Sequence, residues 1–383
     1  MSTERLYYDH SELTEFSARV TCMRVEDRQV WITLDRSAFY PTSGGQPYDT
    51  GVLCAGDRSV DVSDVEVRDG EVWHRIGGML FPGTEVTGTI DRDRRRDHTQ
   101  QHGGEHMLAG AVWRLLGGTT IGLHLGAEDS SIDVTLPDGR TRLEDGEIRL
   151  LEEFVNTHIQ ADEEIRCWFP SEEELAALPL RKPPTVTEHV RIVAIGDWEM
   201  VACGGTHPKR TGEIGLVKIL SVAPARGKAR ITFVCGMRAF RYFSVCQRSA
   251  ERAGQLLSVR PGGLNAAVEA LKEKCASLER ELSSCRAEEY ERRLEGENGV
   301  LYLEEGDISA LQEAVSRYIR QPERIALTGA AGRLIFARGA DAAPDMAALL
   351  RRVARGGGRP DMASGAGGEE AVRAAAALLT EPN

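Results

Sequence analysis

Two short segments rich in histidine and cysteine constrain this sequence more than any other feature. Segment 97–108 places His98, His102 and His106 four residues apart, so on a helix all three side chains share one face. About a hundred residues later, Cys203 and His207 are also four residues apart. Two histidines from the first segment, together with this cysteine and histidine, would form a ligand set suited to zinc. A histidine pair alone is more often a capping or solvated pair, but the two segments together predict a zinc site.

The size and charge of the chain narrow the class of protein. At 383 residues it is long enough for two or three domains, each with a core. Its net charge of −12 argues against indiscriminate nucleic-acid binding, although local basic patches occur at 92–96, 181–182, 209–210 and 225–230. The eight cysteines are scattered rather than regularly spaced. We therefore expect reduced thiols and a cytoplasmic protein, with no signal peptide and no membrane span.

Residues 1–92 are predicted to form a small β-barrel or sheet. Short alternating apolar runs, separated by Gly, Pro and Asp turns, fill the region from about residue 19 to residue 90. Within it, Pro41, Gly44 and Gly45 mark a loop where the backbone turns sharply and can approach a ligand closely. A long hairpin turn without a ligand is the simpler interpretation of this loop.

Residues 93–245 are predicted to form an α+β domain that carries the zinc ligands. A helix is expected from near Asp97 to a stop at Gly117-Gly118, followed by alternating strands and helices, among them a helix at 145–160. Gly103 and Gly104 each cost about 1 kcal/mol relative to alanine inside such a helix. We therefore expect a close backbone approach at this pair.

The last third of the chain changes character. From 246 to 296 we predict a helical arm, in which apolar residues at alternating spacings of four and three form a coiled-coil seam that pairs with itself or with a partner. The seam residues are Leu264, Val268, Leu271, Cys275, Leu278, Leu282 and Cys285. Residues 297–383 are predicted to form an α/β domain. Its glycines 356–358, which precede Arg359, are expected to form a loop able to contact a phosphate.

Six motifs follow one another along the chain. They are DRSAFYPTSGGQ (35–46), QQHGGEHML (100–108), HLG (124–126), LRKPP (180–184), CGGTH (203–207) followed by TGEIG, and GGGRPDMASG (356–365). In this order they resemble the editing module of alanyl-tRNA synthetases. They resemble more closely the free-standing alanyl-tRNA editing proteins of the long type, and the tail is similar to the DHH-associated domain of both.

This resemblance implies a hydrolase that removes serine or glycine from wrongly charged tRNA(Ala). It also implies one zinc ion held by His102, His106, Cys203 and His207, which leaves His98 as an extra histidine one turn earlier. No adenylate-forming domain precedes the module in this sequence, so we expect editing in trans and no aminoacylation. The arm and tail are expected to hold tRNA or to form a homodimer.

The resemblance also suggests which residues take part in recognition and catalysis. Ser37, where the family usually has threonine, is a candidate partner for the hydroxyl of a seryl group. The loop Gly44-Gly45-Gln46 is expected to bring backbone N–H groups and the Gln46 amide to the ester, although a loop-stabilising hydrogen bond is the alternative for Gln46. Gln101, beside the first ligand, is a further catalytic candidate.

Four residues are predicted to contact tRNA: Arg181, Lys182, Gly357 and Arg359.

Two other functions compete with hydrolysis of a tRNA ester. His102-x-x-Glu105-His106 also fits the inverted zincin pattern H-x-x-E-H, in which the glutamate is the general base of a metalloprotease. The Cys/His second segment argues against this alternative. The second competitor is not an enzyme: zinc would only hold together an RNA-binding or dimerisation protein.

Overall fold

The computed structural model describes residues 3–380, and the chain forms two compact units, Met1–Arg248 and Ser249–Asn383. Helix α4 (Gly236–Leu257) continues from the first unit into the second. The four predicted domains are a finer division and stay a prediction, and their outermost residues, 1–2 and 381–383, lie outside the described residues. No helix within 3–380 has both the length and the apolar character needed to cross a membrane.

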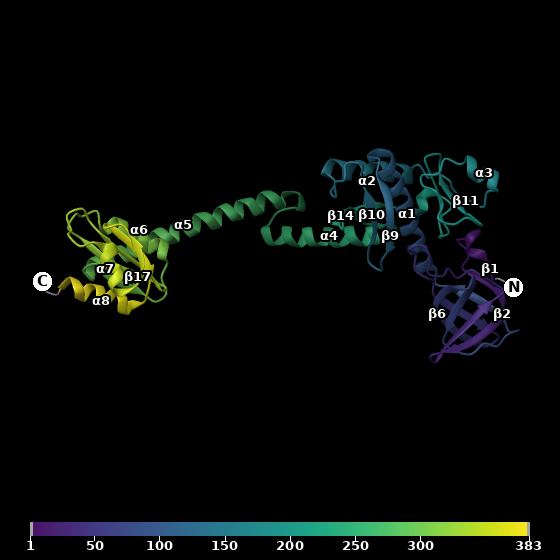
Figure 1. Ribbon diagram of the computed structural model, residues 1–383, viewed down its shortest axis with the longest axis horizontal. Helices are drawn as coiled ribbons and strands as arrows, with labels where there is room; N and C mark the ends of the chain where they lie inside the picture. Colours follow the sequence, from purple (N-terminus) through teal and green to yellow (C-terminus); the bar gives the residue numbers. More distant parts are fainter. Residues whose placement is uncertain (1–2, 381–383) are drawn as a thin grey trace. The chain divides into compact units, whose positions relative to one another are not determined.

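Six antiparallel strands close into a barrel in the first unit (Figure 1), as the alternating sequence predicts. The barrel order is β2–β3–β7–β6–β5–β8. The strands are β2 (Glu15–Glu26), β3 (Gln29–Leu34), β5 (Gly51–Ala55), β6 (Arg58–Arg68), β7 (Glu71–Ile76) and β8 (Glu85–Ile90). Along β2, Phe16, Ala18 and Val20 point inward and alternate with exposed residues, as a sheet with one buried face requires.

The rest of the first unit is an α+β layer, which confirms the predicted fold class. Helices α1 (Arg92–Leu116) and α2 (Asp145–Gln160) share a core with an antiparallel sheet of order β14–β15–β10–β9. Its strands are β9 (Thr119–Leu125), β10 (Ser130–Thr135), β14 (Val217–Ala225) and β15 (Lys228–Cys235). A smaller sheet contains β11 (Ile165–Trp168), β12 (Ile192–Ile195) and β13 (Glu199–Ala202), and α3 (Glu172–Ala177) follows β11.

Helix α1 begins at Arg92, earlier than the predicted start near Asp97. The side chain of Asp91 accepts hydrogen bonds from the backbone N–H groups of Asp93 and Arg94 and so caps the helix upstream of the histidines. The helix ends at Gly117 (φ 64°), as predicted. A Cβ atom on Gly104 would lie 2.2 Å from the sulfur of Cys235, which confirms the expected close approach at the glycine pair.

A buried ion pair joins α1 to the barrel. Nε of Arg95 on α1 donates to the Asp49 carboxylate at 3.0 Å, and the Arg95 guanidinium also donates to the backbone oxygen of Ala38 at 2.6 Å. Both charged side chains are almost fully buried. Removal of either partner would leave an unpaired buried charge, so this contact fixes the register of the histidine helix against the barrel.

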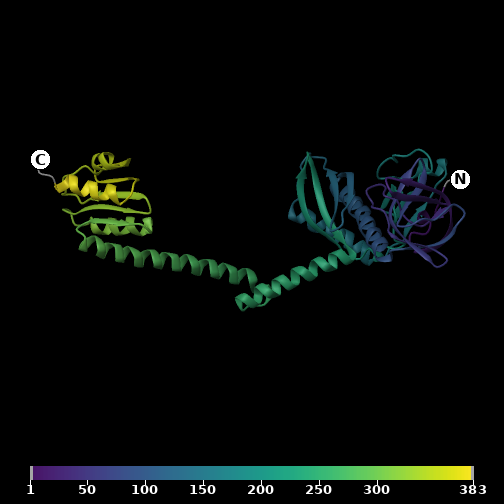
Figure 2. The ribbon, with the colours of Figure 1, turned by 90° about the horizontal axis from the view of Figure 1, so that it is seen from below.

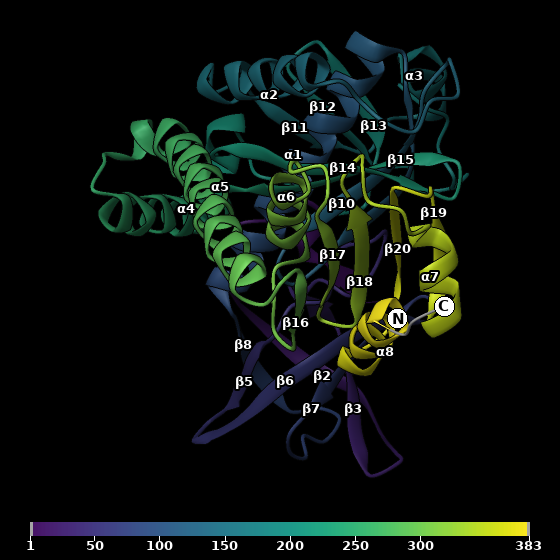
Figure 3. The same cartoon turned by 90° about the vertical axis from the view of Figure 1, so that its left-hand side faces the viewer.

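The second unit has three layers, visible in Figure 2. A five-stranded sheet lies between α5 (Leu264–Gly296) and α6 (Ile308–Tyr318) on one face and α7 (Met346–Val353) and α8 (Glu369–Thr380) on the other. Figure 3 shows the strand order β16–β17–β18–β20–β19. The strands are β16 (Val300–Leu303), β17 (Ile325–Ala330), β18 (Arg333–Arg338), β19 (Arg355–Gly358) and β20 (Met362–Ala366).

The predicted glycine loop at 356–358 is wrong, because these residues form β19 and pair with β20. A Cβ atom on Gly356 would lie 2.5 Å from the backbone oxygen of Ser364, so glycine permits a pairing that a larger residue would obstruct.

The predicted seam lies on α5, where Val268, Leu271, Leu278 and Leu282 are exposed. The end of α5 packs into the second unit through Ala287, Tyr290 and Leu294. Pairing of the seam with another helix stays a prediction.

Candidate metal centre and pocket

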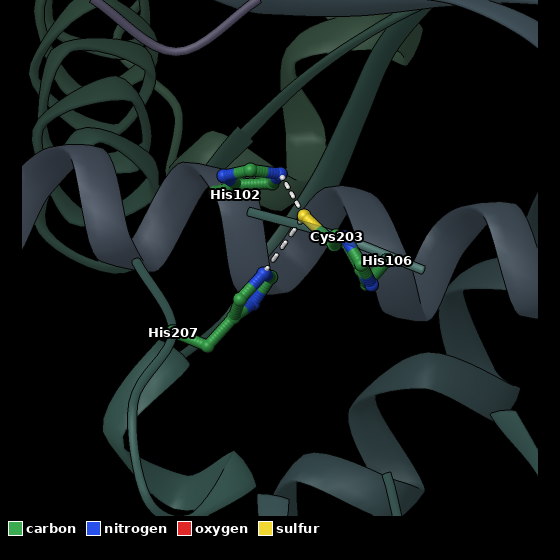
Figure 4. Close-up of side chains that lie close together, drawn as sticks. All are labelled: His102, His106, Cys203 and His207. Carbon is green, nitrogen blue, oxygen red and sulfur yellow. Dashed lines mark hydrogen bonds between the residues drawn. The ribbon is translucent and has the colours of Figure 1, made fainter. Parts of the chain in front are cut away.

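Four buried or half-buried side chains form a group that could hold a metal ion (Figure 4): His102, His106, Cys203 and His207. Helix α1 presents His102 and His106, and the loop after β13 presents Cys203 and His207. Nε2 of His102 and Nε2 of His207 each lie 3.4 Å from Sγ of Cys203. One nitrogen or sulfur atom from each residue lies within 4.8 Å of the others. The structure therefore brings together the four residues that the sequence predicts.

Burial favours the protonation state in which imidazole can bind a metal. It lowers the pKa of His102 to about 3 and those of His106 and His207 well below their ordinary value. All three rings are thus neutral at neutral pH. Burial raises the pKa of the Cys203 thiol to about 12, so a cation must displace its proton when it binds.

Gln46 orients one of these ligands. Its Oε1 accepts a hydrogen bond from Nδ1 of His102 at 2.7 Å and another from the backbone N–H of Thr206 at 3.1 Å, while its Nε2 donates to the Thr206 hydroxyl at 2.8 Å. With the proton on Nδ1, Nε2 of His102 has a free lone pair facing Cys203. Gln46 is fully buried and does not line the pocket described next, so its contacts support a positioning role.

A cavity of about 950 Å³ opens beside this centre, and His102, His106 and Cys203 lie in its wall. The barrel contributes the loop residues Ser43 and Gly44, and β9 contributes Thr120 to Leu123. The β9–β10 ladder shifts register between Asp133 and Val134, where β9 borders the cavity. Such irregularities redirect side chains near binding sites.

Glu105, Arg181 and Lys182 are among the charged residues of the cavity wall. Glu105 is buried, with Oε2 lying 3.8 Å from Nε2 of His106, and burial raises its pKa to about 7. Arg181 forms a buried ion pair with Glu199, Nε to Oε1 at 2.9 Å, so its charge is already compensated. Lys182 is exposed and has no hydrogen bond or ion pair within residues 3–380. Of the two cations predicted to contact tRNA here, Lys182 is the more available.

Two further predicted catalytic residues, Ser37 and Gln101, also lie outside the cavity wall. Ser37 is fully buried, and its Oγ lies 2.7 Å from Nε2 of His74, a barrel residue. Gln101 pairs with the backbone of Cys235 through both its amide oxygen and its amide nitrogen, at 3.0 Å each. These contacts show how both side chains support the fold. Roles for them in substrate recognition or catalysis stay predictions.

The loop Gly44-Gly45-Gln46 does approach the pocket. Gly44 (φ 58°) lines the cavity, and Gly45 (φ 87°) packs so tightly on β9 that a Cβ atom would lie 2.8 Å from the backbone oxygen of Leu123. In the second unit, Gly357 and Arg359 are exposed, and Arg359 pairs with Asp361 at 3.3 Å. Their predicted contact with tRNA is untested.

Sequence reasoning missed Arg191. Its guanidinium donates to the backbone oxygens of Tyr8, Cys203 and Gly205, at 2.9 to 3.1 Å, and so holds the Cys203 loop against the N-terminal segment. Nothing in the local sequence around Arg191 indicates this role, because all its acceptors are main-chain atoms distant in the sequence.

His98, the extra histidine of α1, is buried and is not part of the group of four.

Comparison with known proteins identifies the relatives of this chain. Residues 3–94 match a family described as tRNA synthetases class II (A), and residues 190–232 match the threonyl and alanyl tRNA synthetase second additional domain, which includes Cys203 and His207. Over 95% of its length the chain is 34% identical to an alanine–tRNA ligase of Pyrococcus abyssi and 32% identical to that of Pyrococcus furiosus. The chain is a relative of alanyl-tRNA synthetases.

The relationship predicted from the six motifs is therefore confirmed. The chain spans 42% of the length of both Pyrococcus relatives, so their whole activity does not transfer to it. A partial match of similar extent, 33% identity over 95% of this chain and 42% of the relative, is found with the alanine–tRNA ligase of Archaeoglobus fulgidus.

Proposed function

We propose that this protein hydrolyses the ester bond that links serine or glycine to tRNA(Ala). One observation carries the proposal: the His102/His106/Cys203/His207 group lies in the wall of a large cavity, within a chain related to alanine–tRNA ligases over 95% of its length. The relationship supports a role with tRNA, and the open cavity supports chemistry on a substrate. Editing in trans, a cytoplasmic location and a homodimer remain predictions from the sequence.

We infer that the group binds zinc. Three imidazoles and one thiolate are a ligand set typical of that ion. In a tetrahedral zinc site, a nitrogen ligand and a sulfur ligand lie about 3.5 Å from each other. The distances from Nε2 of His102 and of His207 to Sγ of Cys203 are both 3.4 Å. The hydrogen bond from Nδ1 of His102 to Gln46 orients the ring, as such bonds usually do for zinc-binding histidines. Bound there, zinc would supply positive charge at the cavity wall.

The chain's own residues would position the substrate. The exposed ammonium group of Lys182 is available to a phosphate at the cavity rim, and the backbone of Gly44 borders the cavity from the barrel side. Gln46 acts on the centre through His102, because its amide contacts the ring of that ligand and not the cavity. Catalysis would then depend on placing the ester beside the metal ligands.

Two observations disfavour the competing functions. A metalloprotease of the inverted zincin type would use Glu105 with three protein ligands and a water on the metal, whereas Cys203 adds a fourth protein ligand to the three histidines here. A purely structural zinc would be enclosed by protein, whereas three of the four ligand residues border a cavity of about 950 Å³. Both observations favour a hydrolase with an accessible centre.

The proposal is tested by initial rates of deacylation of Ser-tRNA(Ala), Gly-tRNA(Ala) and Ala-tRNA(Ala). We expect hydrolysis of the first two and little hydrolysis of the third. A casein digestion assay on the same preparation tests the protease alternative. Binding of tRNA(Ala) without release of serine or glycine would favour the non-enzymatic alternative and refute the proposal.

A further inference from the structure

The cavity offers more than a place for an amino acid. Its volume of about 950 Å³ lies near the upper end of the usual range for small-molecule sites, far beyond the needs of a seryl group. Beside the polar centre, its wall contains large apolar side chains that are unusually exposed. Phe169 is 43% exposed, Ile121 45% and Val186 54%. Seryl and glycyl groups each offer little more than one methylene, too little apolar surface to cover these side chains, so another part of the substrate must do so.

An aromatic pair connects this apolar wall to the candidate metal centre. The rings of Tyr8 and Phe169 meet edge to face, with their centroids 5.7 Å apart. Tyr8 lies against the Cys203 loop, because a Cβ atom on Gly204 would be 3.8 Å from its ring and its hydroxyl. Arg191 fixes this arrangement by donating to the backbone oxygens of both Tyr8 and Cys203. The pair thus extends from a ligand loop to the half-exposed ring of Phe169.

Cationic groups lie near the same wall. The guanidinium of Arg5 lies 5.8 Å from the centre of the Tyr8 ring and donates to the Tyr8 hydroxyl at 3.1 Å. Lys182 borders the cavity with an exposed ammonium group. Flat aromatic surface beside cations is the combination that proteins use to bind unpaired nucleotides, with the base on the ring and the phosphate on the cation.

We infer that Phe169 stacks on the terminal base of the tRNA, the adenine of the adenosine whose ribose carries the aminoacyl ester. This inference rests on the proposed function and names the part of the substrate that fills the apolar side of the cavity. The ribose joins the base directly to the ester, so a base on Phe169 would hold the ester toward the Cys203 loop through Tyr8. Phe169 is then a positioning residue, and its contact is with the nucleoside rather than the amino acid.

The test measures binding without hydrolysis. The probes are serinamide and 3′-seryl-amido-3′-deoxyadenosine, a stable analogue of the aminoacylated end, titrated calorimetrically into the zinc-loaded full-length chain. Phe169→Ala should weaken binding of the adenosine analogue about 5- to 160-fold, the range for one stacked base. It should leave serinamide binding unchanged. Phe169→Tyr should restore the affinity, and Phe81→Ala, which removes an exposed phenylalanine outside the cavity wall, should have no effect.

The outcomes separate this inference from the proposed function. Unchanged affinity of Phe169→Ala for the analogue would overturn the nucleoside site, even if Ser-tRNA(Ala) is hydrolysed normally. Equal weakening of both probes would also overturn it, because Phe169 would then support the centre itself. Selective loss of analogue binding, in a protein that releases no serine from tRNA, would uphold the nucleoside site while refuting the hydrolase. With an active enzyme, Phe169→Ala should raise KM for Ser-tRNA(Ala) and leave kcat nearly unchanged.

Discussion

Replacement of Gln46 by methionine should weaken zinc binding although Gln46 is not a ligand. Methionine has nearly the same length, but it cannot accept from His102 or pair with Thr206. The substitution therefore removes three hydrogen bonds, of 2.7, 2.8 and 3.1 Å, around one ligand. Without its acceptor, the His102 ring can rotate or place its proton on Nε2, the nitrogen that faces Cys203. Loss of such supporting contacts typically costs about 10- to 100-fold in metal affinity.

The assay is competition for zinc with a chromophoric chelator, at pH 7.5 and constant ionic strength. Gln101→Met is the matched control, because Gln101 is, like Gln46, a fully buried glutamine. It lies on α1, and its two hydrogen bonds go to the Cys235 backbone rather than to a candidate ligand. The control should lose stability and keep its zinc affinity. Gln46→Glu should retain most of the affinity, since a carboxylate still accepts from His102. Zinc affinity of Gln46→Met within twofold of the wild type would refute this role for Gln46.

Three further predictions concern the candidate metal ligands, the barrel residue His74 and the loop that contains Gly44 and Gly45. Cys203→Ala should lose zinc in elemental analysis whereas His98→Ala should keep it, because only the former belongs to the group of four; the reverse result would show a wrong ligand set. Burial lowers the pKa of His74 to about 4 from 6.5, so the unfolded state takes up the proton first as pH falls. The contribution of neutral His74 to the free energy of unfolding is fully present above pH 6.5. It should decrease by about 3 kcal/mol when the pH falls to 4. Urea unfolding of His74→Gln at both pH values should show a correspondingly smaller decrease, and an equal decrease would contradict the assignment. Gly45→Ala should cost about 1–3 kcal/mol more than Gly44→Ala in thermal unfolding, the usual cost of overpacking, since both have positive φ but only Gly45 abuts a β9 carbonyl oxygen. Equal costs would contradict the packing of the loop.

Features that depend on short-range patterns could be predicted from the sequence. The helix at 145–160 has the predicted bounds, because acidic residues begin it and an apolar stripe sustains it. The barrel follows from the alternation along strands such as β2. The start of α1 was missed because Asp91 caps the helix before the histidine motif begins. The β19 strand was missed because its pairing depends on the close approach of β20, and a glycine run in isolation indicates a loop.

The candidate site shows the same division. The four-residue spacings within each segment are local patterns, the family resemblance implies His102 and His106 rather than His98, and the structure brings these two histidines together with Cys203 and His207. The partner of Gln46 is not local: its amide pairs with His102 on α1, 56 residues away in the sequence, and does not line the cavity. A motif can indicate that a residue belongs to a site, but the partner of its side chain depends on tertiary packing.

The most direct test of a hydrolytic metal centre is the rate of serine release from Ser-tRNA(Ala) before and after removal of zinc. The protein is treated with a chelator, dialysed, checked by circular dichroism for retained folding, and then reloaded with one equivalent of zinc. We expect loss of hydrolysis in the folded, zinc-free protein and recovery of the rate on reloading. Serine release at an undiminished rate by folded protein without zinc would contradict this expectation.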